Sequence, residues 1–174
     1  MQNSKGEHSL VQLARKTITT FIKNGKMIES PVELTAEMQG RAGVFVSLHR
    51  RGELRGCIGT FSPTTKNVAE EIIHNAATAA TQDPRFSPVR EDELEDLEIS
   101  VDVLTDPVPA ASTKELDAKR YGVIVKSGSR RGLLLPDLPG VKTPEEQIAI
   151  CRQKAGIREN EPVELFKFEV RRFH

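Results

Sequence analysis

Apolar residues recur at helical spacing in three segments of the chain. The first stripe predicts a helix over about 10–23, with Ser9 and Gln12 as its capping box; its members are Leu10, Leu13, Ala14, Thr17, Ile18 and Phe21. A second helix is expected to open at 62–65 and to end before Asp83-Pro84, and its stripe is Val68, Ile72, Asn75, Ala76 and Ala79. Thr143, Pro144 and Glu146 predict the start of a third helix, which ends at Gly156.

Elsewhere the apolar period changes to two, which is typical of half-buried strands. Two strands, over about 44–49 and 53–58, flank a turn and predict a hairpin; 97–103 predicts a single strand. A second hairpin is expected from 121–126 and 131–135, and a last strand over about 163–173. Hairpins mixed irregularly with three helices predict the α+β class with mainly antiparallel sheets, not a regular βαβ sheet.

Length and composition narrow the class of protein further. The 174 residues suit one domain, and the 37% of hydrophobic residues is enough for a core. The 25 basic residues balance the 25 acidic ones, so no overall field attracts nucleic acid or an anionic membrane. Only two cysteines, no signal-peptide pattern and no long apolar run together predict a cytoplasmic protein that does not span a membrane.

The densest candidate chemistry lies in Leu-Arg-Gly-Cys-Ile-Gly, residues 54–59. In a regular strand Arg55 and Cys57 share one face, with Cα atoms about 6.5–7 Å apart. A guanidinium beside a thiol favours the nucleophilic thiolate, and Gly56 and Gly59 allow a substrate to approach the backbone closely. The alternative is that Cys57 is a small buried apolar residue and that the glycines mark a bulge or a turn.

A second candidate cluster surrounds the end of the second helix. Asn75 lies on an apolar stripe, where a buried amide needs partners and either braces a loop or orients a ligand. Asp83 and Arg85 follow, and they either contribute to binding or simply cap backbone amides and pair with neighbouring charges. Both interpretations are open from the sequence.

The remaining cysteine, histidines and arginines carry weaker signals. Cys151 lies on the inward stripe of the third helix, which predicts burial without a disulfide. The four histidines lack ligand-like spacing, so no metal site is expected, and whether His49 faces Cys57 depends on the hairpin register. Three arginine pairs are either an RNA-binding patch or solvated turns and edges: Arg50-Arg51, Arg130-Arg131 and Arg171-Arg172.

Taken together, several blocks of the chain resemble the AMMECR domain family. They are residues 43–48, 54–59, 75–77, 83–86, 97–104, 132–136 and 151–156. The resemblance covers about 9–173, a single domain of this type, and leaves 1–8 as an expected flexible N-terminus. It implies a two-lobed α+β fold with a cleft between the lobes near the hexapeptide; the subdomain boundaries are not readable from the sequence.

The resemblance implies no established reaction and no cofactor, but it does imply partners that resemble Memo proteins and radical S-adenosylmethionine (radical-SAM) enzymes. The leading hypothesis is a site that binds or modifies a small or peptidyl substrate. Cys57 and Arg55 are its catalytic candidates, and its binding candidates are Gly56, Gly59, Asn75, Asp83 and Arg85. The alternatives are a non-catalytic protein-interaction module and, third, an RNA-binding protein.

Overall fold

The computed structural model describes residues 6–174 and divides into two compact units. Unit 1 contains the chain through Val103 together with Arg171–His174, and unit 2 is Leu104–Val170. Unit 1 is therefore built from both ends of the chain. The sequence-predicted flexible segment 1–8 lies partly outside the described residues, because its first five positions are not among them.

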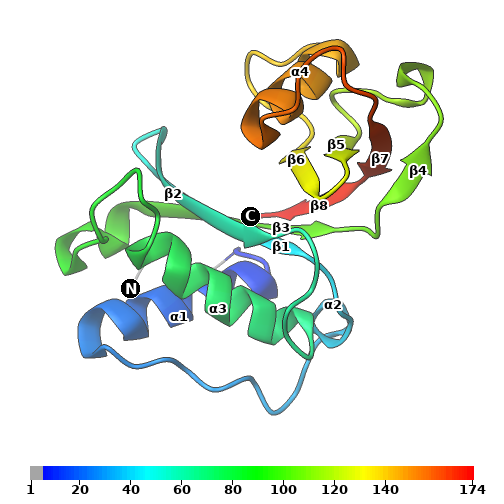
Figure 1. Cartoon of the computed structure of the whole chain (residues 1–174). Helices are drawn as coiled ribbons and strands as arrows, with labels where there is room; N and C mark the ends of the chain where they lie inside the picture. The colour runs from blue at the N-terminus through cyan, green and yellow to red at the C-terminus, as the bar shows by residue number, and fades with distance from the viewer. Residues whose placement is uncertain (1–5) are drawn as a thin grey trace. The chain divides into compact units, whose positions relative to one another are not determined.

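Unit 1 is one antiparallel sheet covered on one face by helices (Figure 1). The strand order is β2-β1-β3-β8, with bounds β1 Val44–Arg50, β2 Glu53–Thr60, β3 Leu97–Leu104 and β8 Val170–Phe173. The helices are α1 Ser9–Asn24, the short α2 Ala36–Gln39 and α3 Val68–Thr81, and a 3-10 helix, η1 Glu91–Asp96, leads into β3. β2 forms one edge of the sheet.

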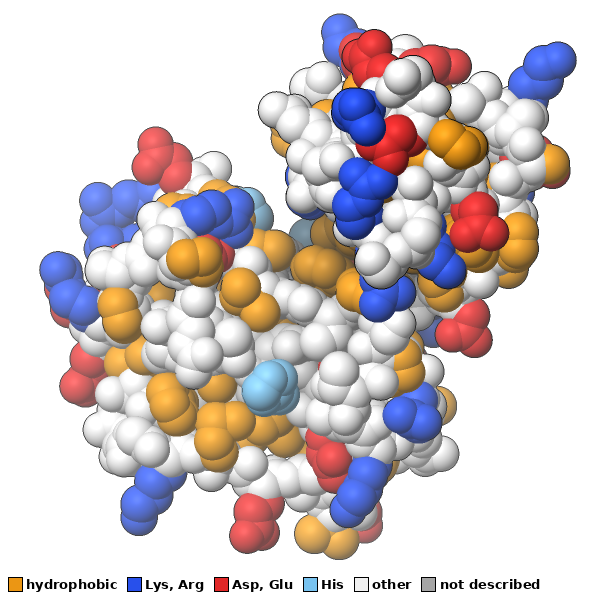
Figure 2. Space-filling view, in the orientation of Figure 1, with side chains coloured by type: hydrophobic (Ala, Val, Ile, Leu, Met, Phe, Trp, Pro, Cys, Tyr) orange, Lys and Arg blue, Asp and Glu red, His pale blue; other side chains and the backbone are white. Residues whose placement is uncertain are grey.

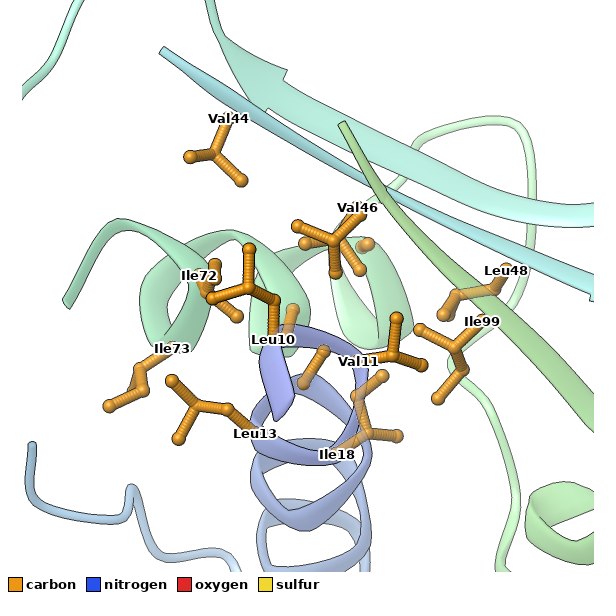
Figure 3. Close-up of a cluster of buried hydrophobic side chains, with 14 of the residues drawn as sticks. Leu10, Val11, Leu13, Ile18, Val44, Val46, Leu48, Ile72, Ile73 and Ile99 are labelled. Atoms are coloured by element: carbon orange, nitrogen blue, oxygen red, sulfur yellow. The ribbon is translucent and has the colours of Figure 1, made fainter. Parts of the chain in front are cut away.

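The core of unit 1 lies between the sheet and the two long helices. Alternate side chains of β1, namely Val44, Val46 and Leu48, are fully buried and point toward α1 and α3 (Figure 3). They meet the predicted apolar stripes of both helices, including Leu10, Ile18 and Ile72, and they also meet Val11 of α1, which the predicted stripe did not contain. The other face of the sheet carries the intervening residues and is free of helices within this unit.

Unit 2 is a second antiparallel sheet with its own core. Its order is β4-β7-β5-β6, with bounds β4 Val108–Ala110, β5 Gly122–Ser127, β6 Arg130–Leu134 and β7 Glu164–Phe168. Helix α4, Pro144–Ala155, packs against β5 and β6, and η2 covers Thr113–Glu115. Val123, Val125 and Cys151 are fully buried in this core.

These elements confirm the α+β class with antiparallel sheets and flanking helices, and they confirm the capping box that opens α4 at Thr143. Two predicted helix starts are wrong. α1 is capped by His8, whose Nδ1 accepts a hydrogen bond from the N–H of Leu10, and not by Ser9. α3 begins after its cap Asn67, because residues 62–65 instead form a loop that is bonded to Glu71.

The predicted last strand is in fact two strands, β7 and β8, separated at Glu169. The N–H of Glu169 donates to the hydroxyl of Thr105 at 2.8 Å, and the N–H of Thr105 donates to the Glu169 carbonyl at 2.9 Å. The backbone at this point is thus bonded to the segment that follows β3, and β7 and β8 belong to different sheets. The pattern analysis also missed β4, η1 and η2, which are short or polar.

Candidate functional site

Cys57 lies on the edge strand β2. At this residue the outer edge of the strand is covered by the salt-bridged pair Asp83 and Arg85. Its N–H donates to the Asp83 carboxylate at 2.9 Å, and Arg85 Nη2 is 3.5 Å from its carbonyl. Arg85 also binds both carboxylate oxygens of Asp83, at 3.1 and 2.9 Å. The Asp-Pro-Arg segment after α3 therefore takes the place of a neighbouring strand at Cys57.

The Cys57 thiol lies on the sheet face opposite the helices, within a row of small polar side chains. Cys57 pairs with Ser47 on β1, whose Oγ is 3.3 Å from the sulfur, and Ser47 pairs with Ser100 on β3. Burial raises the pKa of the thiol, while the hydrogen bond with Ser47 and the charge of Arg85 oppose that rise. The net shift is upward, so the thiol is the dominant form at neutral pH.

Arg55 does not serve this thiol as the sequence interpretation supposed. Its guanidinium binds the Glu93 carboxylate through two bonds of 3.0 and 2.9 Å and also donates to the carbonyls of Ser87 and Pro88. The physical reason is an irregularity in the hairpin: Gly56 pairs with Leu48 and Leu54 with His49, so Arg55 is an extra residue. Simple alternation fails across this bulge, and the arginine that acts on the Cys57 thiol is Arg85.

The two glycines of the hexapeptide make close approaches on opposite faces of β2. Gly56 faces α3, where a Cβ atom would overlap the carbonyl oxygen of Ala79. Gly59 lies beneath the ring of Phe45, its partner on β1. Both positions are thus occupied by packing against the protein itself, which explains glycine there without a ligand.

Asn75 is buried and braces the sheet, but beside the hexapeptide rather than on it. Its Nδ2 donates to the carbonyl of Val44 at 2.9 Å and to the hydroxyl of Thr60 at 3.2 Å. Within residues 6–174, the Asn75 side chain makes no hydrogen bond to residues 55–59, where a bond was expected. Asn75 therefore joins α3 to both strands at the far end of the hairpin.

Sequence reasoning missed Ser47, Glu71 and Glu93, each of which holds a site residue or its neighbours. Ser47 is recognisable only once the register with Cys57 is known. Glu93 lies in an acidic run that looks like a solvated surface segment, and Glu71 lies on a helix in an apolar context. No periodicity marks a carboxylate whose partners are far away in the chain.

The other candidate chemistry is structural or dispersed. Cys151 is buried and free, as predicted. His49 pairs with Leu54, so the hairpin register does not set a histidine opposite Cys57. Within residues 6–174 no group of three or more His, Cys, Asp or Glu side chains is placed to hold a metal ion.

Each predicted arginine pair contains a residue bound to a carboxylate. Arg50 binds Glu93 and Asp96, Arg130 binds Glu161, and Arg172 binds the buried Asp102 at 2.8 Å. On the face drawn in Figure 2, basic and acidic side chains are intermixed, without a continuous basic field. This face lacks the positive stripe that is typical of nucleic-acid binding.

The family model described as AMMECR1 matches residues 11–173 of this chain. The chain belongs to the AMMECR1 family. A protein of Thermotoga maritima is 52% identical over 171 residues, covering 97% of this chain and 98% of the relative. The fold agrees with the crystal structure of an uncharacterised Pyrococcus horikoshii protein, with a TM-score of 0.85 at 35% identity over 94% of this chain and 88% of the other.

One AMMECR1 relative is much longer than this chain. A protein of Clostridium acetobutylicum is 51% identical over 93% of this chain, yet the match covers only 35% of that relative. In that relative the matching region is therefore part of a longer chain. In the part of the present chain that the structure describes, no helix is long and apolar enough to cross a bilayer.

Proposed function

We propose that this AMMECR1 protein binds a peptidyl substrate non-covalently beside Cys57 on β2. The observation that carries the proposal is the set of groups gathered there: a protonated thiol, the hydroxyl of Ser47, and a guanidinium that is 55% exposed. Such groups donate and accept hydrogen bonds with a polar backbone. The raised pKa of Cys57 favours a contact residue over a nucleophile, because the thiolate is the reactive form.

A role beside other proteins is part of the proposal. The long Clostridium relative, in which this domain is only about a third of the chain, supports a domain that works next to another protein. We propose that Memo-like and radical-SAM proteins are the partners that act on the bound substrate. Titration of a purified Memo-like protein into this one, followed by calorimetry, is expected to show saturable binding that a matched unrelated protein does not show.

Alkylation of the two cysteines tests the binding site directly. Iodoacetamide is expected to modify Cys57 more slowly than free cysteine at pH 7, and Cys151 more slowly still, since burial raises the pKa of Cys151 to about 11. Peptide mapping by mass spectrometry separates the two. A mixture of N-acetylated tetrapeptides is expected to protect Cys57 and leave Cys151 unchanged.

The matched control compares two serines of the same row. Ser47→Ala removes the hydrogen bond that lowers the pKa of Cys57 and is expected to slow its alkylation, whereas Ser100→Ala, one strand further away, is expected to change it little. Alkylation of Cys57 faster than free cysteine would instead identify a catalytic thiolate. A rate unaffected by every peptide would refute binding at this site.

A further inference from the structure

The outer edge of β2 is hydrogen-bonded to Asp83 at Cys57, but two residues later, at Gly59, its backbone groups are unbonded among the described residues. The N–H of Cys57 points away from β1, since it bonds to Asp83. In an antiparallel pair the direction of the backbone groups repeats every two residues, so the N–H and carbonyl of Gly59 point to the same edge. Among the hydrogen bonds of residues 6–174, none outside the strand ladder engages the backbone of Gly59.

The direction of β2 determines which end of an added strand reaches this place. A peptide that pairs antiparallel with β2 runs from Thr60 toward Cys57, so its carboxyl end points toward Arg85. The N–H of Cys57 already donates to Asp83. A strand that pairs with Gly59 therefore cannot also pair with Cys57. An antiparallel occupant must therefore end near Gly59.

Arg85 can accept such an end. Its bonds to Asp83 and Cys57 use Nε and Nη2, and within residues 6–174 its Nη1 makes no hydrogen bond. The Asp83 carboxylate is only 3% exposed and its oxygens are already bonded to Arg85 and to backbone N–H groups, whereas the Arg85 side chain is 55% exposed. The accessible charge at the blocked end of the edge is thus positive.

We infer that the open edge of β2 binds the carboxyl terminus of an extended peptide, with the Gly59 N–H and the Arg85 guanidinium holding its terminal carboxylate. The carbonyl of Gly59 accepts the N–H of the last peptide residue, as in strand addition to a sheet edge. A guanidinium suits a carboxylate because it presents parallel N–H donors. This inference rests on the proposed function and specifies its substrate class.

The test compares tetrapeptides that differ only at the carboxyl end. N-acetylated tetrapeptide mixtures with a free carboxylate are expected to bind at least about tenfold more tightly than the matched carboxamides, because only the carboxylate pairs with Arg85. Acetate, which has the charge but no backbone, is expected to bind far more weakly than the acids. The readouts are fluorescence anisotropy and the shift and exchange rate of the Gly59 amide by NMR.

Variants assign the effect to Arg85. Arg85→Gln is expected to lower the affinity for the acid to that of the amide, and Arg85→Lys to retain part of it because it keeps the charge. The control is Arg90→Gln, since Arg90 is also exposed and also pairs with a carboxylate two residues away, Asp92, but lies off this edge. The Gly59 amide shift in each folded variant excludes loss of the fold as the cause.

The outcomes separate the inference from the proposed function. Equal binding of acid and amide, with Cys57 still protected, overturns the carboxylate inference and leaves peptide binding standing. If the peptide acid still binds more tightly than the carboxamide in Arg85→Gln, another residue binds the carboxylate. That result also overturns the inference. If neither peptide binds nor protects Cys57, the proposed function fails as well.

Discussion

At the scale of single residues, two arginines near the hexapeptide have different surroundings and so different roles. Arg55 is 15% exposed and is held by Glu93, which is itself 7% exposed and also binds Arg50. Arg85 is more than half exposed, and its bonds to Asp83 and Cys57 use Nε and Nη2. A largely buried guanidinium whose three nitrogens are all hydrogen-bonded stabilises the local fold, whereas an exposed one retains donors for a ligand.

Replacing Glu93 tests the structural role of Arg55. Glu93→Gln is expected to lower the free energy of unfolding by about 3–5 kcal/mol, because it removes the buried carboxylate that pairs with the partly buried Arg55 guanidinium. Urea denaturation measures this loss. The control Asp96→Asn, which affects an exposed partner of Arg50, is expected to cost less than about 1 kcal/mol.

In the same Glu93→Gln sample, alkylation of folded Cys57 is expected to keep its rate, since the pKa of that thiol depends on burial, Ser47 and Arg85. A large change in the rate of Cys57 alkylation, with little loss of stability, would instead support a catalytic role for Arg55.

The Glu93 carboxylate also makes the free energy of unfolding depend on pH. The Arg55 side-chain bond lowers the pKa of Glu93 from 4.5 to about 2 in the folded state. Because the folded pKa is depressed, the stabilisation is present above the unfolded pKa and is lost as the pH falls toward about 2; the shift corresponds to about 3 kcal/mol. Denaturation midpoints between pH 6 and 2 are expected to fall less steeply in Glu93→Gln than in the parent protein.

Asn75 offers a third residue-scale test. Asn75→Ala is expected to cost about 1–3 kcal/mol, because the Val44 carbonyl and Thr60 hydroxyl lose a buried donor. The rate of Cys57 alkylation in the folded variant is expected to stay the same, since these bonds do not reach residues 55–59. The exposed neighbour His74→Ala serves as the control for melting, and a changed alkylation rate in Asn75→Ala would show coupling that the bonds do not explain.

At the scale of elements, the start of α3 depends on one buried carboxylate. Glu71 accepts hydrogen bonds from the hydroxyls of Thr60, Thr64 and Thr65 and from the N–H groups of Thr64 and Thr65. These bonds lower the pKa of Glu71 although burial opposes the shift. One side chain thereby ties the end of β2 and the following loop to α3.

Glu71→Gln is expected to destabilise the protein by about 3 kcal/mol, because an amide brings an N–H group against several donors and removes the charge. The matched control is Glu70→Gln, the preceding residue, which makes one long bond of 3.5 Å to the N–H of Lys66. Hydrogen exchange is expected to show faster exchange of the amides of Thr64 and Thr65 in Glu71→Gln only. Similar losses in both variants would contradict this assignment.

At the scale of the whole molecule, unit 1 depends on the last four residues of the chain. β8 completes its sheet, Arg172 binds the buried Asp102, and Phe173 packs against its core. Unit 2 is continuous and has a separate core. The stability of the two units is therefore expected to respond differently to a change at the carboxyl end.

Truncation after Val170 is expected to destabilise unit 1 selectively, since an uncompensated Asp102 and exposed apolar surface remain. NMR amide spectra are expected to show large changes in residues 6–103 and few in 108–168. Removal of His174 alone, which loses one bond from the N–H of His8, is the milder control. A uniform loss of signals from both units would show that they unfold as one.

The elements with strong periodicity can be predicted from local sequence alone. The apolar stripes of α1, α3 and α4 and the alternation in β1 and β3 record which side chains face a core, and this depends on neighbours a few residues away. The capping box of α4 is equally local. The hexapeptide and the other blocks shared with the family are also local features, so they can be recognised from the sequence.

The division of the candidate residues between binding and structural support depends on contacts that form only in the folded chain. The bulge at Arg55 follows from the pairing of Leu54 with His49, and the partners Glu93 and Ser47 come from segments 38 and 10 residues away. A guanidinium or carboxylate takes whichever charged or polar group the fold brings within about 3 Å, and no local pattern encodes that choice. The sheet order likewise decided that β2 is an edge, which is why the backbone of Gly59 is available and Arg85, not Arg55, is the exposed cation beside Cys57.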